Sequence, residues 1–232
     1  MLSERNVGNM TALTQFLQAG GETYAYRRFG SGQGLPLLFL QHFTGTLDNW
    51  DPAVTDPLAS GRAVILFESA GLGRSTGKVP DTVAGMAEHA LAFLDGLGLK
   101  TCDVLGYSLG GMVAQQMAQD RTSVFRRMIL VGTAPRGGED VMHLDKPSLA
   151  KYLGDPNLKG YTVLQKIFFT PTESSQDAGA TFIERLSQRT NDREPVSGPA
   201  VAQAKWQPFE TGRNLPVSAS RTSKTSCIQP LS

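Results

Sequence analysis

The sequence predicts an α/β fold with a mostly parallel sheet and flanking helices. Two observations predict it: short apolar runs typical of buried strands alternate with segments whose apolar residues recur at helical spacing, and glycine-rich turns separate the two kinds of segment. A length of 232 residues with 40% hydrophobic content is enough for one such domain with a sizeable core.

The N-terminal elements start with a hairpin, whose strands are expected over 14–18 and 22–29 around Gly20-Gly21. The apolar run 35–41 is typical of a central buried strand. Asp48 is a plausible N-cap for the helix that follows, which Gly61 ends. The remaining expected elements are a strand over 63–67, a helix capped by Asp81 that ends near 96–98, a strand from 102, a helix that runs to 120 and a sixth strand over 125–131.

Residues 106–110 read Gly-Tyr-Ser-Leu-Gly and lie between a strand pattern and a helix pattern. A serine on a sharp strand-to-helix turn stands clear of the sheet edge, with the helix N-terminus and a backbone N–H directed at its oxygen. Ser108 is therefore the candidate nucleophile. The alternative is a glycine-rich turn that only packs a helix against a sheet.

Charge and cysteine content exclude several classes of protein. The 22 basic and 21 acidic residues give a net charge of +1, so nothing indicates binding to nucleic acid or to an anionic membrane. Cys102 and Cys227 form neither a disulfide framework nor a metal-ligand spacing. The N-terminus lacks an apolar signal region, and no apolar run is long enough to span a bilayer. We expect a soluble, cytoplasmic protein that acts on a small molecule and needs neither cofactor nor metal.

The chain divides into three parts by composition. Residues 1–136 form the expected α/β core, and residues 137–211 have helical stretches without a convincing strand pattern, which predicts a helical cap. Residues 212–232 are rich in serine and contain no acidic residue, which is typical of a disordered tail.

Three segments, in this order, carry a resemblance to a known family. They are Gln41-His42-Phe43-Thr44-Gly45, Glu68-Ser69-Ala70-Gly71-Leu72-Gly73-Arg74-Ser75 and Gly106-Tyr107-Ser108-Leu109-Gly110-Gly111. The chain resembles the single-domain members of the α/β-hydrolase superfamily that carry a helical cap. The resemblance covers about 14–134 well. It implies an oxyanion hole made by the backbone N–H groups of Phe43 and Leu109, which would stabilise negative charge in an acyl-transfer transition state.

The resemblance fails after the cap, where family members continue with two more strands that lead to the catalytic acid and the catalytic histidine. Neither is visible here, so the chain looks like a shortened or frame-shifted relative. Only His143 lies downstream of Ser108, with Glu139 and Asp140 shortly before it. The spacing leaves open whether His143 acts as the base or is a solvated histidine of the cap; His42 is a further histidine that could reach the site.

These features predict a serine hydrolase that acts on a small ester, thioester or lactone, with Ser108 as nucleophile. A second hypothesis remains: a catalytically silent, hydrolase-like protein that binds a small apolar ligand or a partner chain.

Loss of the last two strands would leave the strand 125–131 at the edge of the sheet, although its Met-Ile-Leu-Val sequence is typical of an interior strand. We expect one of three consequences: a homodimer joined along this strand, a tail segment such as 215–218 covering it, or a tendency to aggregate.

Overall fold

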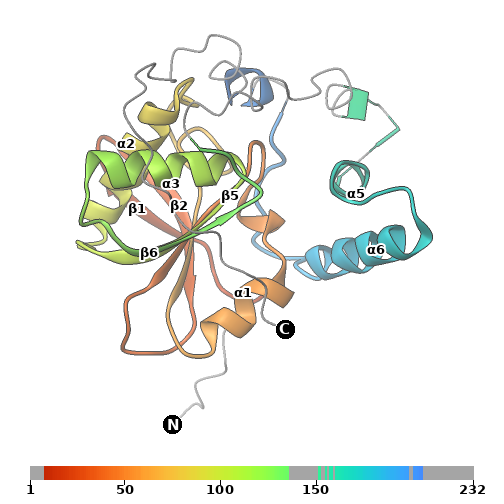
Figure 1. The fold of residues 1–232 in the computed structure, drawn as a ribbon, viewed down its shortest axis with the longest axis horizontal. Helices are drawn as coiled ribbons and strands as arrows, with labels where there is room; N and C mark the ends of the chain where they lie inside the picture. The colour runs from red at the N-terminus through yellow and green to blue at the C-terminus, as the bar shows by residue number, and fades with distance from the viewer. Residues whose placement is uncertain are drawn as a thin grey trace.

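The computed structural model describes residues 8–135, 151–152, 155, 157–158, 160–198 and 201–205. Its centre is a six-stranded sheet with the strand order β1-β2-β4-β3-β5-β6 (Figure 1). The two pairings of β2 are antiparallel and the other three are parallel. The strands are β1 (Gln15–Ala19), β2 (Glu22–Phe29), β3 (Leu37–Leu40), β4 (Val64–Phe67), β5 (Cys102–Tyr107) and β6 (Phe125–Val131). The predicted α/β fold with a mostly parallel sheet is confirmed.

Helices cover both faces of this sheet. Figure 1 shows α2 and α3 on one face and α1 on the other. Alternate residues of β3 divide between two apolar clusters accordingly, because successive side chains of a strand point to opposite faces: Leu38 packs with the residues of α2 and α3, and Phe39 with those around α1. The bounds of these helices are Pro52–Ala59 for α1, Val83–Gly96 for α2 and Leu109–Asp120 for α3.

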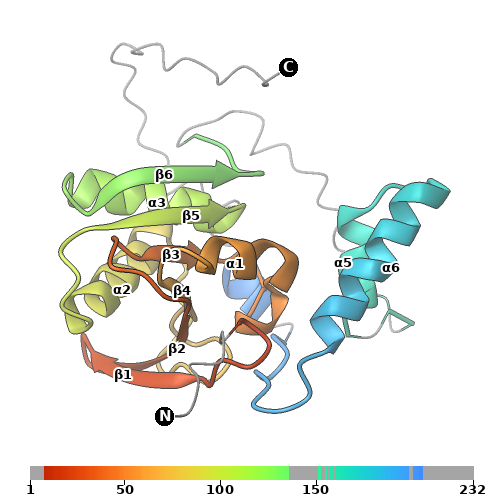
Figure 2. The same ribbon diagram turned by 90° about the horizontal axis from the view of Figure 1, so that it is seen from below.

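Two further helices, α5 (Thr162–Phe168) and α6 (Glu173–Ser187), pack against each other beside one end of the sheet (Figure 2). They fall within the segment 137–211 that the sequence predicts to be a cap. The rest of that segment is only partly described, and the expected tail 212–232 lies outside the described residues. No helix in the described ranges has both the length and the hydropathy needed to cross a membrane.

The two predicted N-caps were wrong. Asp51 caps α1, and its Oδ1 accepts a hydrogen bond from the Ala53 N–H at 2.9 Å. Thr82, not Asp81, caps α2. Asp48 instead lies in a short 3₁₀ helix, η1 (Leu47–Asn49), where its side chain is 3% exposed and turned inward. The side chain points inward because it pairs with Arg27, which lies 21 residues earlier in the sequence.

A buried network of charges attaches the segment after α6 to the core. Arg27 of β2 is fully buried, and its Nη2 donates to Oδ1 of Asp48 at 2.6 Å. Oδ2 of Asp48 accepts a hydrogen bond from the backbone N–H of Glu194 at 2.7 Å. Arg189, 3% exposed, donates to the backbone carbonyl of Ala12 at 2.9 Å. We call the five charged residues Arg27, Asp48, Arg74, Arg189 and Glu194 the clasp.

Arg74 extends the clasp to the loop after β4. Its Nη2 lies 2.8 Å from Oε1 of Glu194, and its Nε donates to the same oxygen at 3.1 Å. Hydrogen bonding to Glu194 raises the pKa of the Arg74 guanidinium above its ordinary value. The chain leaving α6 is thus bound by charged groups to β2, to η1 and to the loop after β4.

The clasp generates a prediction about stability. Replacing Arg27 with Met leaves the carboxylates of Asp48 and Glu194 buried without their central cation, so the free energy of unfolding is expected to fall by about 3–5 kcal/mol. The control is Arg121→Met, which removes an ion pair with Asp95 in which the two side chains are 33% and 57% exposed; its loss is expected to be below about 1 kcal/mol. Urea denaturation measures both. Similar losses for the two variants would contradict a structural role for the clasp.

Candidate active site

Ser108 occupies a strained turn between β5 and α3. Its φ of 53° and ψ of −120° lie in a region that residues other than glycine rarely adopt. It stands at the N-cap position of α3, yet its side chain makes no capping hydrogen bond to the helix. Its backbone N–H donates to the carbonyl of Val131, at the end of β6, at 2.9 Å. The hydroxyl is therefore not used to hold the helix, and the backbone beneath it is fixed.

Glycines allow this turn to pack closely. A Cβ at Gly106 would lie 2.6 Å from the Cα of Gly111, and a Cβ at Gly110 would collide with the backbone carbonyl of Leu40 in β3. A Cβ at Gly111 would lie 2.6 Å from the side chain of Thr133. Side chains at these positions would push α3 away from the sheet, so the glycine spacing of the motif follows from the contact between helix and strands.

Two backbone segments approach this turn. Leu109 is the first residue of α3, and the N–H groups in the first turn of a helix have no acceptor within the helix. Phe43 follows the end of β3, the strand that pairs with β5 so that Leu40 lies opposite Gly106. Phe43 also packs against the apolar cluster that includes Leu109. The parallel pairing thus brings both predicted oxyanion-hole residues to the same edge of the sheet as Ser108.

An aromatic layer lies beside the turn. The ring of His42 is 5.5 Å, centroid to centroid, from the ring of Tyr107 and 5.5 Å from the ring of Phe168, with both pairs edge to face. Burial, assisted by the positive charge of Lys205, lowers the pKa of His42 to about 3. The imidazole is therefore neutral at neutral pH. Since Phe168 belongs to α5, this helix contacts the site directly.

A small cavity opens next to the first turn of α3. The residues that line it include Gln41, Ser69, Leu109, Gly110 and Lys205. The Lys205 residue is 2% exposed, and burial lowers the pKa of its ammonium group to about 8, an effect that the negative charge of Glu68 partly offsets. A cationic side chain is thus held close to the helix N-terminus that follows the serine.

Glu68, at the end of β4, is the acidic counterpart of Lys205. Its side chain is buried, and its Oε2 accepts a hydrogen bond from the backbone N–H of Leu47 at 3.0 Å. Burial, and to a smaller extent the charge of Glu194, raises the pKa of Glu68 to about 8, although the Leu47 hydrogen bond and the charges of Lys205 and Arg27 act in the opposite direction. Glu68 orders the loop that contains η1.

Comparison with known proteins decides the family. Residues 36–224 match the family described as alpha/beta hydrolase fold. The chain belongs to this α/β-hydrolase family. A solved alpha/beta hydrolase fold protein from Chitinophaga pinensis superposes with a TM-score of 0.81 and 39% sequence identity, over 87% of this chain and 72% of that one.

Curated relatives of this α/β hydrolase match shorter stretches. The dihydrolipoyllysine-residue acetyltransferase component of the acetoin cleaving system of Cupriavidus necator is 37% identical over 110 residues, which is 47% of this chain and 29% of the relative. Rhodomycin D methylesterase DnrP of Streptomyces peucetius is 27% identical over 177 residues, which is 74% of this chain and 58% of the relative. The chain thus spans less than two thirds of the length of either relative.

In this α/β hydrolase Leu109 directly follows Ser108, Phe43 packs against the apolar cluster that includes Leu109, and the ring of His42 lies against that of Tyr107. His143 lies outside the described residues, so its place in the site stays a prediction. Sequence reasoning missed Lys205, because a single lysine in a helical segment without a motif carries no signal of burial. Within the described ranges, no three or more His, Cys, Asp and Glu side chains gather in a way that could hold a metal ion.

The buried carboxyl group of Glu68 generates a prediction about pH. Its pKa is raised to about 8 in the folded chain, against an ordinary value near 4.5. The folded state therefore binds this proton more tightly than the unfolded state, and the stability that the group contributes is lost as the pH rises from about 4.5 to 8.

Glu68→Gln keeps an acceptor for the Leu47 N–H but cannot ionise, so the fall in the free energy of unfolding between pH 5 and 8 is expected to be shallower than in the parent chain. Glu68→Met, which also removes the acceptor, is expected to be less stable than Glu68→Gln throughout this range. Urea denaturation at several pH values measures both effects. An unchanged pH dependence in Glu68→Gln would contradict the assignment.

Proposed function

We propose that this α/β hydrolase cleaves a small ester, thioester or lactone through Ser108. The observation that carries the proposal is the strained backbone of Ser108 at the start of α3, with a hydroxyl that caps nothing. Strain of this kind persists only where the surrounding structure enforces it, and it concentrates at functional sites.

In this mechanism the Ser108 Oγ attacks the acyl carbonyl carbon and loses its proton to a base. The carbonyl oxygen becomes negatively charged, and the N–H groups of Leu109 and Phe43 serve as its donors. Each such donor is typically worth about 3–4 kcal/mol of the barrier. The alcohol or thiol then leaves with a proton, and water hydrolyses the acyl-serine to a free acid.

The attack by Ser108 needs a base to accept its proton. His42 is next to the site, but with a pKa near 3 it is a poor proton acceptor at neutral pH. We propose His143 as the base, with Glu139 or Asp140 to orient it. A serine without an efficient base retains only the catalysis that the oxyanion hole and substrate binding supply, several orders of magnitude below that of a complete triad.

The choice of an ester is supported by a relative. The Streptomyces peucetius protein that matches 74% of this chain is named a methylesterase. The aromatic layer beside Ser108 supports an apolar acyl or alcohol group. Phe168 of α5, which contacts His42 and Tyr107 in this layer, is 42% exposed and would offer apolar surface to such a group.

A second candidate function is a catalytically silent protein that binds a small apolar ligand. The observation that favours it concerns the two histidines in the described part of the chain: His42 lies among aromatic rings, and His89 pairs with the hydroxyl of Tyr24 at 2.6 Å. Within the described part of the chain, neither histidine forms an ion pair with a carboxylate.

A fluorophosphonate probe distinguishes the two functions. The hydrolase proposal predicts stoichiometric labelling of Ser108, which mass spectrometry of peptides locates. Labelling is expected to disappear in Ser108→Ala and to persist in Ser123→Ala, which changes an exposed serine outside the turn at 106–110. Circular dichroism establishes that each variant is folded. A folded chain that does not react with the probe would favour the silent binding protein.

A further inference from the structure

The small cavity beside the first turn of α3 combines two positive features. Leu109 and Gly110, the first two residues of α3, line the cavity, and so does Lys205. The cavity has a volume of about 10 Å³, which is room for one water-sized group. A helix N-terminus and a cationic side chain therefore share a space that fits a single small polar group.

The start of α3 has backbone donors without acceptors in the helix. The N–H groups of Leu109 and Gly110 belong to the first turn, where no carbonyl of the helix can accept them. Ser108 stands at the N-cap, and its side chain makes no capping hydrogen bond. Over the 12 residues of α3, the aligned peptide dipoles leave about half a positive charge at this end. These groups are suited to an oxygen that carries negative charge.

Lys205 reaches the cavity from a distant part of the sequence. It belongs to the helical residues 201–205, and it is 2% exposed. Among the described residues, Lys205 forms neither an ion pair nor a side-chain hydrogen bond, although the negative charge of Glu68 favours its ammonium form. A buried cation that is not directly paired is costly, so it calls for a ligand of opposite charge.

The charged groups around Lys205 do not fully supply that negative charge. Burial raises the pKa of Glu68 to about 8, and the charge of Glu194 acts in the same direction, against the charges of Lys205 and Arg27. His42, on the other side of Lys205, is neutral at neutral pH. The helix dipole opposes a cation at the N-terminus of a helix. An anion in the cavity would relieve this repulsion.

We propose that Lys205 is a third donor of the oxyanion hole in this α/β hydrolase. Its ammonium group and the N–H groups at the start of α3 hold the oxygen that becomes negatively charged when Ser108 attacks the acyl carbonyl. Leu109 connects the two sets of donors, because it lines the cavity and is also the expected backbone donor. This inference rests on the proposed function of Ser108. A fixed cation in a site that excludes water stabilises such an oxygen more strongly than it would in water.

The protonation state of Lys205 sets the sign of the pH dependence. An ammonium group has three donors and no acceptor, so it can stabilise the oxyanion but cannot take the proton of Ser108. Burial lowers the pKa of this group to about 8, against an ordinary value of 10.5. The donor is therefore present below about pH 8 and is lost as the pH rises above that value.

The second-order rate constant for labelling of Ser108 by a fluorophosphonate tests the role, because the phosphonyl oxygen takes the place of the acyl oxygen. At pH 7 the rate constant of Lys205→Met is expected to fall at least about tenfold, since loss of one oxyanion donor typically costs about 100-fold or more. Lys205→Arg keeps the charge and is expected to recover most of the rate.

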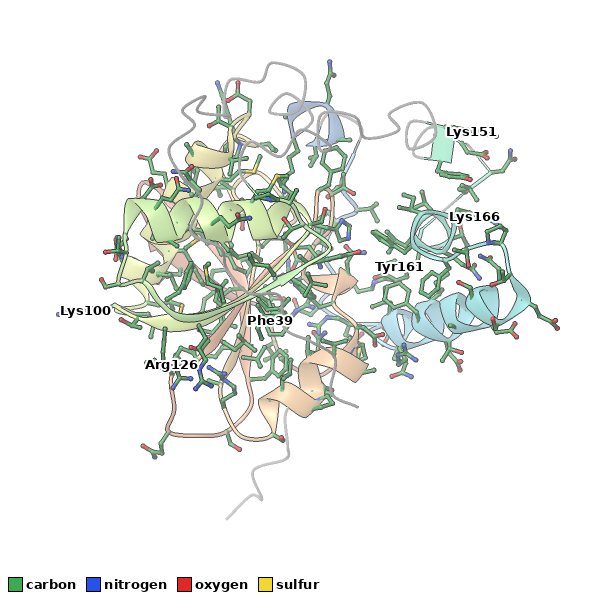
Figure 3. All side chains as sticks on the ribbon, viewed as in Figure 1. Phe39, Lys100, Arg126, Lys151, Tyr161 and Lys166 are labelled. Carbon is green, nitrogen blue, oxygen red and sulfur yellow. The ribbon has the colours of Figure 1, made fainter. Side chains whose placement is uncertain are left out.

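Lys100→Met is the matched control. Lys100 is exposed and precedes the amino end of β5, whereas Ser108 follows the carboxyl end of the same strand (Figure 3). This variant also removes one positive charge, and it is expected to react with the fluorophosphonate at the parent rate.

Labelling between pH 7 and 10 separates a donor from a lysine that only holds the fold. The parent rate is expected to fall above about pH 8, and Lys205→Arg is expected to lack this fall because arginine stays charged. Glu68→Gln removes the charge that favours the ammonium form, so the fall is expected to move to lower pH. A purely structural lysine would give the parent and Lys205→Arg the same pH profile.

Two further results would overturn this inference alone. They are equal rate constants for the parent and Lys205→Met, and a parent rate that rises through pH 8, which would make neutral Lys205 a base. A folded parent chain that does not react at all would overturn the proposed function together with this inference. If circular dichroism shows that Lys205→Met is unfolded, the pH profiles of the parent and Lys205→Arg still decide the question.

Discussion

The backbone conformation of Ser108 is the constraint on which the rest of the structure depends. A residue with a side chain at φ 53° and ψ −120° is strained by about 1–3 kcal/mol. The strain is offset by close contact of α3 with β3, β5 and Thr133, which only glycine permits at positions 106, 110 and 111, and by the hydrogen bond from Ser108 to Val131. The glycine spacing around Ser108 and the start of α3 both serve to hold this one residue in place.

The clasp connects that site to the helices beside it. Arg27 and Asp48 are buried charges, and taking them out of water is costly unless each has a good partner. The pairing with Glu194 supplies such partners and fixes the path of the chain after α6, while Phe168 of α5 meets His42 beside the serine. A charged network is directional, so it holds the segment in one position where an apolar contact would allow sliding.

The strands and the serine turn could be predicted from the sequence because their signals are local: apolar runs of a few residues, and a fixed glycine spacing around Ser108. The predicted N-cap Asp48 was wrong because a distant partner decided the outcome: Asp48 pairs with Arg27, 21 residues away, and Asp51 caps α1 instead. The buried positions of Glu68 and Lys205 depend on packing between segments far apart in the sequence. No sequence motif around Lys205 indicates that this side chain is buried.

The free energies of unfolding of Ser108→Gly and Ser108→Ala test the central claim most directly. Both variants lack the hydroxyl, but only glycine adopts a positive φ without a steric cost. If Ser108 is held in a strained turn, Ser108→Gly is expected to be more stable than Ser108→Ala by about 1 kcal/mol or more, despite the greater entropy of glycine in the unfolded chain. An alanine variant as stable as the glycine variant, or more stable, would show that the backbone at this position is relaxed and would contradict the account.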